Sequence, residues 1–189
     1  MAEITIALAG NPNAGKSTIF NALTGARQHV GNWPGKTVQK KEGLFKYNNL
    51  EMKVVDLPGT YSLSAYSMEE QVARDFIVKD KPSLVINVAD AGNLERNLYL
   101  TTQILETGAP TILVLNMMDV ANDRGVHIDP QKMSAALGGI PVITASASKN
   151  QGLDELKETI ARCVVVLTKQ QQTAGVNGTA PKIVAGGNA

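Results

Sequence analysis

The 189-residue chain has one cysteine, few aromatic residues and no excess of either charge. A single thiol, Cys163, excludes an internal disulfide bond and argues against a zinc or iron–sulfur cluster site held by several cysteines. The formal net charge of +1 gives no electrostatic reason to expect nucleic acid or a membrane surface as a partner. The apolar run at 164–167 is far shorter than the about 20 residues of a membrane-spanning helix. No signal peptide precedes the first predicted strand, so we expect an intracellular domain.

Hydrophobic residues make up 43% of the chain, which is enough for one domain with a substantial core. Strand and helix patterns alternate, which predicts an α/β fold of three layers, with helices on both faces of a mostly parallel sheet. The six expected strands lie at 4–9, 38–47, 51–56, 84–89, 111–115 and 142–144. A turn at Asn48-Asn49 makes the second and third strands an antiparallel pair, with one antiparallel strand at the sheet edge.

Helices are expected at 17–24, 67–78, 94–106, 129–138 and 153–167. Ser67 and Glu70 have the spacing of a capping box, and Asp129-Pro130 is a helix-start signal. The segments 26–36 and 57–66 lack periodicity and are predicted to be loops. From residue 169 onward the composition turns polar without periodicity, so we predict a domain over 1–168 and a flexible tail or linker over 169–189.

The most informative motif runs from Gly10 to Ser17 and reads Gly-Asn-Pro-Asn-Ala-Gly-Lys-Ser. This is the G-x-x-x-x-G-K-S pattern of a phosphate-binding loop (P-loop), and it stands between a predicted strand and a predicted helix, as that motif requires. Backbone N–H groups and the positive end of the helix dipole favour phosphate there. We expect Lys16 to contact the β- and γ-phosphates and Ser17 to bind Mg2+.

A second group of motifs predicts which nucleotide binds. The segment 116–119, Asn-Met-Met-Asp, ends the fifth predicted strand. The Asp119 carboxylate can accept hydrogen bonds from guanine N1–H and N2–H2, a donor pair that adenine lacks. The segment 146–148, Ser-Ala-Ser, follows the sixth strand, where a backbone N–H can meet guanine O6. Both lie at carboxyl ends of strands, where open α/β sheets bind ligands.

Two further segments are expected to respond to the γ-phosphate. In Asp-Leu-Pro-Gly at 56–59, Asp56 reaches Mg2+ through water and the Gly59 N–H contacts the γ-phosphate. The Thr37 hydroxyl completes the Mg2+ shell, in a loop that orders with triphosphate and relaxes after hydrolysis. The expected nucleotide-binding residues are Gly10, Asn11, Pro12, Asn13, Ala14, Gly15, Lys16, Ser17, Thr18, Gly35, Lys36, Thr37, Val38, Gln39, Asp56, Leu57, Pro58, Gly59, Asn116, Met117, Met118, Asp119, Ser146, Ala147 and Ser148.

Over residues 3–167 the chain resembles the N-terminal G domain of the ferrous iron transport protein B (FeoB) family. The most specific strings are Gly-Asn-Trp-Pro-Gly-x-Thr-Val at 31–38 and Asp-Leu-Pro-Gly-x-Tyr-Ser-Leu at 56–63. The resemblance implies a P-loop GTPase domain that binds GTP and GDP, hydrolyses GTP slowly with Mg2+ and regulates ferrous iron uptake. It also implies a longer parent protein in a bacterial or archaeal cytoplasmic (inner) membrane, with a helical regulatory domain and a membrane-embedded transport portion as partners. No nucleic-acid partner and no iron site in this chain are expected.

Two positions depart from the usual GTPase pattern. Met117 stands where most GTPases have the lysine of Asn-Lys-x-Asp, so we expect modest affinity and quick nucleotide release, with Asp119 preserving the choice of guanine. Thr60 stands where Ras-like proteins have the glutamine that orients water, so intrinsic hydrolysis is expected to be slow.

A bound potassium ion is one hypothesis for how hydrolysis proceeds. Asn13 occupies a position that coordinates K+ in related potassium-activated GTPases, and carbonyl groups of 31–35 would complete the site. The expected catalytic residues are then Lys16, Thr37, Gly59 and Asn13. Two alternatives stay open: the G domain of a tRNA-modification or ribosome-assembly GTPase, and a guanine-nucleotide sensor with negligible turnover.

Overall fold

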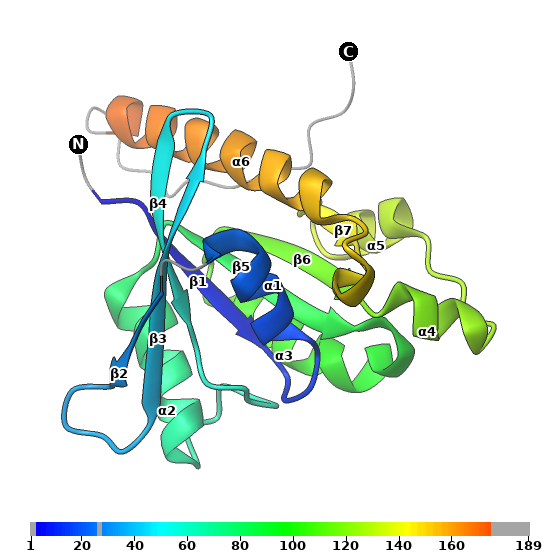
Figure 1. The fold of residues 1–189 in the computed structure, drawn as a ribbon, viewed down its shortest axis with the longest axis horizontal. Helices are drawn as coiled ribbons and strands as arrows, with labels where there is room; N and C mark the ends of the chain where they lie inside the picture. The colour runs from blue at the N-terminus through cyan, green and yellow to red at the C-terminus, as the bar shows by residue number, and fades with distance from the viewer. Residues whose placement is uncertain (1–2, 26–27, 175–189) are drawn as a thin grey trace.

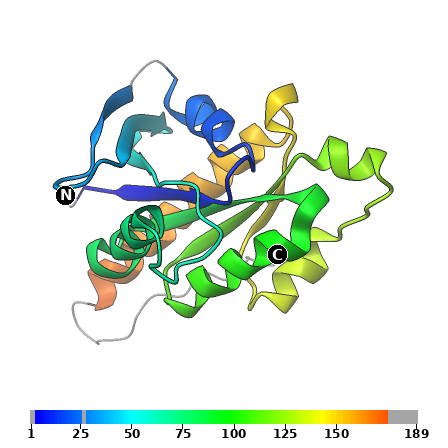
Figure 2. The same cartoon turned by 90° about the horizontal axis from the view of Figure 1, so that it is seen from below.

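The computed structural model describes residues 3–25 and 28–174, which form a twisted sheet with helices on both faces (Figures 1 and 2). Within these ranges the strands are β1 (Thr5–Gly10), β2 (Gln28–Asn32), β3 (Gln39–Tyr47), β4 (Leu50–Asp56), β5 (Leu84–Asp90), β6 (Thr111–Asn116) and β7 (Val142–Thr144). The α-helices there are α1 (Lys16–Thr24), α2 (Met68–Asp75), α3 (Leu94–Glu106), α4 (Met118–Asp123), α5 (Pro130–Ala136) and α6 (Leu153–Ala174). None of these helices is both long enough and apolar enough to cross a lipid bilayer.

The strand order is β2-β3-β4-β1-β5-β6-β7, so the expected α/β fold class is confirmed. β1 lies parallel to both β4 and β5, and β6 lies parallel to both β5 and β7. β3 is antiparallel to both of its neighbours, so among the described strands it alone runs against the others. It lies second in the sheet, so the prediction that the antiparallel strand is at the edge was wrong. Because parallel strands share one carboxyl edge, the loops after β1, β4, β6 and β7 meet there.

The expectation of six strands was wrong by one, because part of the predicted loop 26–36 forms β2. β2 pairs with β3 from Gln28 opposite Gly43 to Asn32 opposite Gln39, and it lies outside β3 at the sheet edge. Almost all of its side chains are exposed. The alternation of buried and exposed residues that signals a strand is therefore absent from β2. Its strand conformation is identified only by the backbone pairing with β3. Residues 26–27 of that loop lie outside the described part.

Alternation along β1 divides the core into two layers. Ile6 and Leu8 face the layer that α1 and α6 cover, whereas Ala7 and Ala9 face the layer of α2 and α3. Cys163 on α6 is buried in the first layer, and burial raises the pKa of its thiol to about 11. The cysteine is therefore a core residue, as the helical pattern around it indicates.

Helix starts are predicted better than helix ends. The Ser67 Oγ accepts a hydrogen bond from the Glu70 N–H (3.1 Å), which confirms the capping box, and Asp129 caps α5. The helix expected to end near residue 78 becomes a π-helix over Phe76–Asp80. α6 continues to Ala174, so the tail predicted from residue 169 is helical over its first residues. Glutamine favours helix, and glycine first interrupts the pattern at 175. The remainder of that tail, 175–189, lies outside the described residues.

Candidate functional site

The P-loop leaves the end of β1 and enters α1 at the carboxyl edge of the sheet (Figure 1). Its turn holds Asn13 and Gly15 in the left-handed region, with φ of 65° and 82°. A side chain at Gly15 would collide with the amide of Asn116, so glycine is required there for space as well as conformation. A cavity of about 460 Å3 opens at this turn. The described residues that line it are Asn11, Pro12, Asn13, Gly15, Lys16, Ser17 and Gly59.

Lys16 and Asp56 form an ion pair beside this cavity, with side chains only 11% and 8% exposed. The pair brings together the P-loop lysine and the carboxylate at the end of β4, a contact that the sequence does not predict. A phosphate entering the cavity would compete for Lys16, and its release would leave the Asp56 carboxylate available to a cation. The nearby Ser17 side chain is exposed. A hydroxyl and a carboxylate are hard oxygen donors of the kind Mg2+ prefers, so this donor set fits the ion.

Asn11 places a buried side-chain amide beside the P-loop. Its side chain is 4% exposed, and its Nδ2 has no hydrogen-bond partner among the described residues. A buried polar group left without a partner costs about 1–3 kcal/mol. An acceptor supplied by a ligand, or by a rearranged loop at the cavity, would remove that cost.

Asn116 connects the phosphate side of the site to the base side. Its Nδ2 donates to the Ala14 carbonyl (2.9 Å), and its Oδ1 accepts from the Ala147 N–H (3.0 Å). Asn116 is 3% exposed. The P-loop, the end of β6 and the segment after β7 are therefore held together by one buried amide, as needed for three motifs that are far apart in the chain to bind one nucleotide.

Asp119 lies in the first turn of α4, where its N–H donates to the Ser146 Oγ (3.1 Å). Its carboxylate pairs with the Lys149 ammonium (Nζ to Oδ2, 2.9 Å). The hydrogen bond from Lys149 holds the pKa of Asp119 below its ordinary value, and the same contact raises the pKa of Lys149. Lys149 is not among the residues expected at this site, although a cation directly after the Ser146–Ser148 segment is visible in the sequence.

The loop before β3 is not brought to the phosphate side. Thr37 is exposed, its Oγ1 lies 4.0 Å from the Met68 Sδ, and it is not among the described residues that line the cavity. Gly35, Lys36, Val38 and Gln39, which were also expected to contact the nucleotide, are likewise absent from the described lining of the cavity. The expected role of Thr37 in the Mg2+ shell therefore requires this loop to move.

Trp33 anchors the start of that loop. Its side chain is 9% exposed and meets the Phe76 ring edge-on, with centroids 5.4 Å apart. The Lys40 ammonium lies 4.9 Å from the Trp33 ring centre, a cation–π distance. The loop before β3 is therefore held by aromatic packing against the start of the π-helix Phe76–Asp80. The sequence around Trp33 has no periodic pattern that would have indicated this burial.

The loop after β4 lies against the P-loop. The buried Thr60 donates its N–H to the Gly10 carbonyl (3.2 Å). A side chain at Gly59 would come within 3.2 Å of the Pro12 Cα, so the Gly59 backbone passes close to the cavity, as the sequence predicts.

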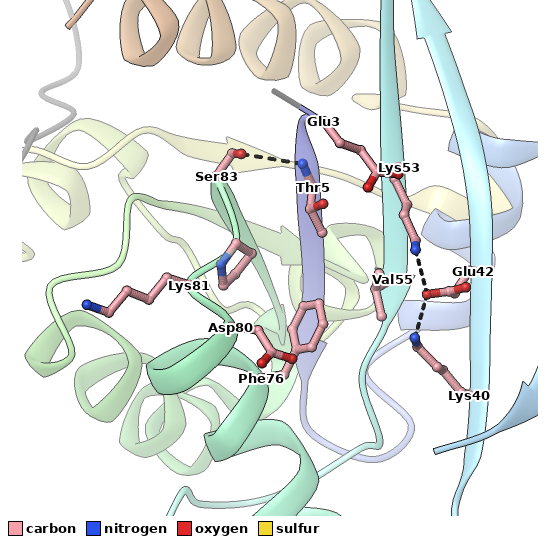
Figure 3. A pocket seen from close by; sticks show the side chains of 11 residues that line it. Glu3, Thr5, Lys40, Glu42, Lys53, Val55, Phe76, Asp80, Lys81 and Ser83 are labelled. Atoms are coloured by element: carbon pink, nitrogen blue, oxygen red, sulfur yellow. Dashed lines mark hydrogen bonds and ion pairs between the residues drawn. The ribbon is translucent and has the colours of Figure 1, made fainter. Parts of the chain in front are cut away.

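A second cavity, of about 230 Å3, lies at the opposite end of β1 (Figure 3). Glu42 is paired there with Lys40 (2.6 Å) and Lys53 (3.0 Å). Burial tends to raise the pKa of Glu42, but the hydrogen bonds and charges of both lysines outweigh it and hold that pKa low. Over its described lining, three lysines (Lys40, Lys53 and Lys81) are balanced by three carboxylates (Glu3, Glu42 and Asp80), so this cavity has no excess positive charge to attract a phosphate.

Comparison with known proteins agrees with this geometry. The family model described as ferrous iron transport protein B matches residues 4–160. The Fe(2+) transporter FeoB of Shigella flexneri is 51% identical over 166 residues, which are 86% of this chain and 21% of that protein. This chain thus spans about a fifth of the length of the curated relatives it matches.

Solved structures extend the comparison to the fold. The FeoB G domain from Methanococcus jannaschii is 51% identical, with a TM-score of 0.76 over 87% of this chain and 99% of that one. The cytosolic domain of T. maritima FeoB in apo form is 47% identical, with a TM-score of 0.81 over 86% and 64%. A mutant of S. thermophilus NFeoB bound to GDP is 48% identical, with a TM-score of 0.79 over 85% and 61%. The chain therefore belongs to the ferrous iron transport protein B family and corresponds to its N-terminal G domain.

Proposed function

We propose that this chain binds GDP and GTP, hydrolyses GTP slowly with Mg2+, and in a longer parent protein regulates ferrous iron uptake. The observation that carries the proposal is the Asn116 amide, which joins the P-loop at Ala14 to the base segment at Ala147. A relative 48% identical to this chain has been solved with GDP bound, which supports guanine nucleotide as the ligand.

Each residue of the site has a proposed role that follows from its chemistry. Lys16 leaves Asp56 to contact the β- and γ-phosphates, and the P-loop N–H groups surround them. Ser17, Asp56 through water, and Thr37 would hold Mg2+, which supplies positive charge between the phosphates. The Gly59 N–H contacts the γ-phosphate, while Asp119 and the backbone of Ser146–Ser148 select guanine.

Substitution of the base-recognition carboxylate tests this proposal. Asp119→Asn should weaken GDP binding by at least about tenfold and favour xanthosine diphosphate, because an amide donates to the carbonyl at position 2 of xanthine. Asp154→Asn, which neutralises a 99% exposed carboxylate on α6, is the control and should bind like wild type. If fluorescent GDP titrations give the same affinity for both variants, Asp119 does not select the base.

We further propose that K+ accelerates hydrolysis through Asn13 and carbonyl groups of the segment 31–35. Asn13 lines the phosphate cavity with its backbone in the left-handed region. A monovalent cation there would supply a fixed positive charge, in the place of an arginine finger. Turnover should be higher in KCl than in matched NaCl, and Asn13→Ala should remove that difference. Equal near-zero turnover in both salts, with intact GDP binding, would favour a sensor instead.

The proposed partners lie outside this chain. Since the chain covers only 21% of its curated relatives, we propose that a helical regulatory domain and a membrane-embedded transport portion complete the parent protein. This domain would then lie on the cytoplasmic side of the membrane. Deletion of the domain from such a parent should remove GTP-dependent iron uptake, which radiolabelled iron accumulation in cells would measure.

A further inference from the structure

The guanine-recognition carboxylate already has a cationic partner. The Lys149 Nζ lies 2.9 Å from the Asp119 Oδ2, while the Lys149 side chain is 57% exposed and that of Asp119 only 20%. The Lys149 backbone is fixed, since its N–H donates to the Ser146 carbonyl (2.9 Å) in a 3-10 turn over Ala147–Lys149. The turn that carries the base segment therefore also positions this lysine, whose long side chain is largely in solvent.

A guanine base needs the same Asp119 carboxylate that this ion pair already engages. Two donors of the base, N1–H and N2–H2, need the two oxygens of Asp119, and one oxygen already holds Lys149. Lys149 is the strongest influence that lowers the pKa of Asp119, and Ser146 and the backbone of Val120 act in the same direction, so the carboxylate is charged and already engaged before any base arrives. Lys149, on a flexible and mostly exposed stem, is the donor that can withdraw without disturbing the fold.

We propose that Lys149 competes with the guanine base for Asp119, and thereby weakens nucleotide binding and speeds release. This inference rests on the proposed binding of guanine nucleotides at Asp119. When the base arrives, its two N–H donors replace the ammonium, which moves into solvent. When the base begins to leave, Lys149 returns to the carboxylate and opposes rebinding. The uncharged Met117, at the usual lysine position, makes no such contact with the carboxylate.

Neutralising the lysine should therefore tighten binding. Exposed ion pairs are weak, so Lys149→Gln should lower the Kd for fluorescent GDP about two- to fivefold, with a slower dissociation rate. Lys149→Arg keeps the cation and should behave like wild type. Lys132→Gln removes the same charge from an 88% exposed lysine on α5 that pairs with Asp129, and should leave the Kd unchanged. Raising the ionic strength should shrink the difference between wild type and Lys149→Gln, because salt screens exposed pairs.

A double-mutant cycle separates competition from a structural role. In the Asp119→Asn background the ion pair is absent, so adding Lys149→Gln should not change the affinity for xanthosine diphosphate. Weaker or unchanged GDP binding by Lys149→Gln would overturn the inference, as would an equal effect of the substitution in both backgrounds. Wild-type protein that binds no guanine nucleotide would overturn the proposed function as well. Wild-type binding with an unaltered Lys149→Gln variant would overturn the competition alone.

Discussion

Removal of the Asn116 amide should destabilise the folded chain even without nucleotide. In Asn116→Ala, the Ala14 carbonyl and the Ala147 N–H each lose a hydrogen-bond partner, and both residues are at most 3% exposed. A buried polar group without a partner costs about 1–3 kcal/mol, so the two together should lower the free energy of unfolding by about 2–6 kcal/mol. That is a large share of the about 5–15 kcal/mol typical of a domain.

The measurement is urea and thermal unfolding of nucleotide-free protein, followed by circular dichroism. A loss of this size corresponds to a fall in Tm of roughly 5–20 °C for a chain of this length. Asn122→Ala, on the exposed surface of α4, is the matched control and should change Tm little. A loss below about 1 kcal/mol in Asn116→Ala would refute the argument, because water or a rearranged loop would then satisfy both backbone groups.

Asn116→Asp separates the two hydrogen bonds. A carboxylate can still accept from the Ala147 N–H, but it has no donor for the Ala14 carbonyl and places negative charge against it. We therefore expect this variant to be destabilised as well. If Asn116→Asp were as stable as wild type, the bond to the P-loop would contribute nothing.

Three further predictions concern single residues. Because burial raises the pKa of Cys163 to about 11, its thiol should stay protonated and react with Ellman's reagent at pH 8 only after unfolding; fast reaction of folded protein would contradict this. Trp33, the single tryptophan, should fluoresce with a blue-shifted maximum and resist acrylamide quenching, and an emission maximum typical of exposed indole would show that it is not buried. Gly15→Ala should destabilise the chain by more than about 1–2 kcal/mol and weaken GDP binding, because φ is 82° and the added methyl meets the Asn116 amide; unaltered unfolding would show that the turn relaxes.

Much of the architecture follows from local pattern. β5 and β6 are buried and largely apolar because helices cover both faces of the sheet, and such runs are visible in the sequence even though Asn87 interrupts the one in β5. β2 has no such signature, since its side chains are exposed and only its backbone pairs. The extension of α6 to Ala174 was likewise hidden, because polar residues at the end of a helix resemble those of a linker.

The functional site also has features that sequence motifs predict and features that only the fold reveals. Sequence patterns are enough to place a P-loop, an Asp-x-x-Gly turn and an Asn-x-x-Asp turn after the first, third and fifth predicted strands, because each needs particular side chains at fixed spacing. The fold alone shows that Lys16 pairs with Asp56, that Asn116 joins Ala14 to Ala147, and that Lys149 forms an ion pair with Asp119. Most of these contacts join residues tens of positions apart. Their partners depend on how the strands are ordered in the sheet, which no local pattern specifies.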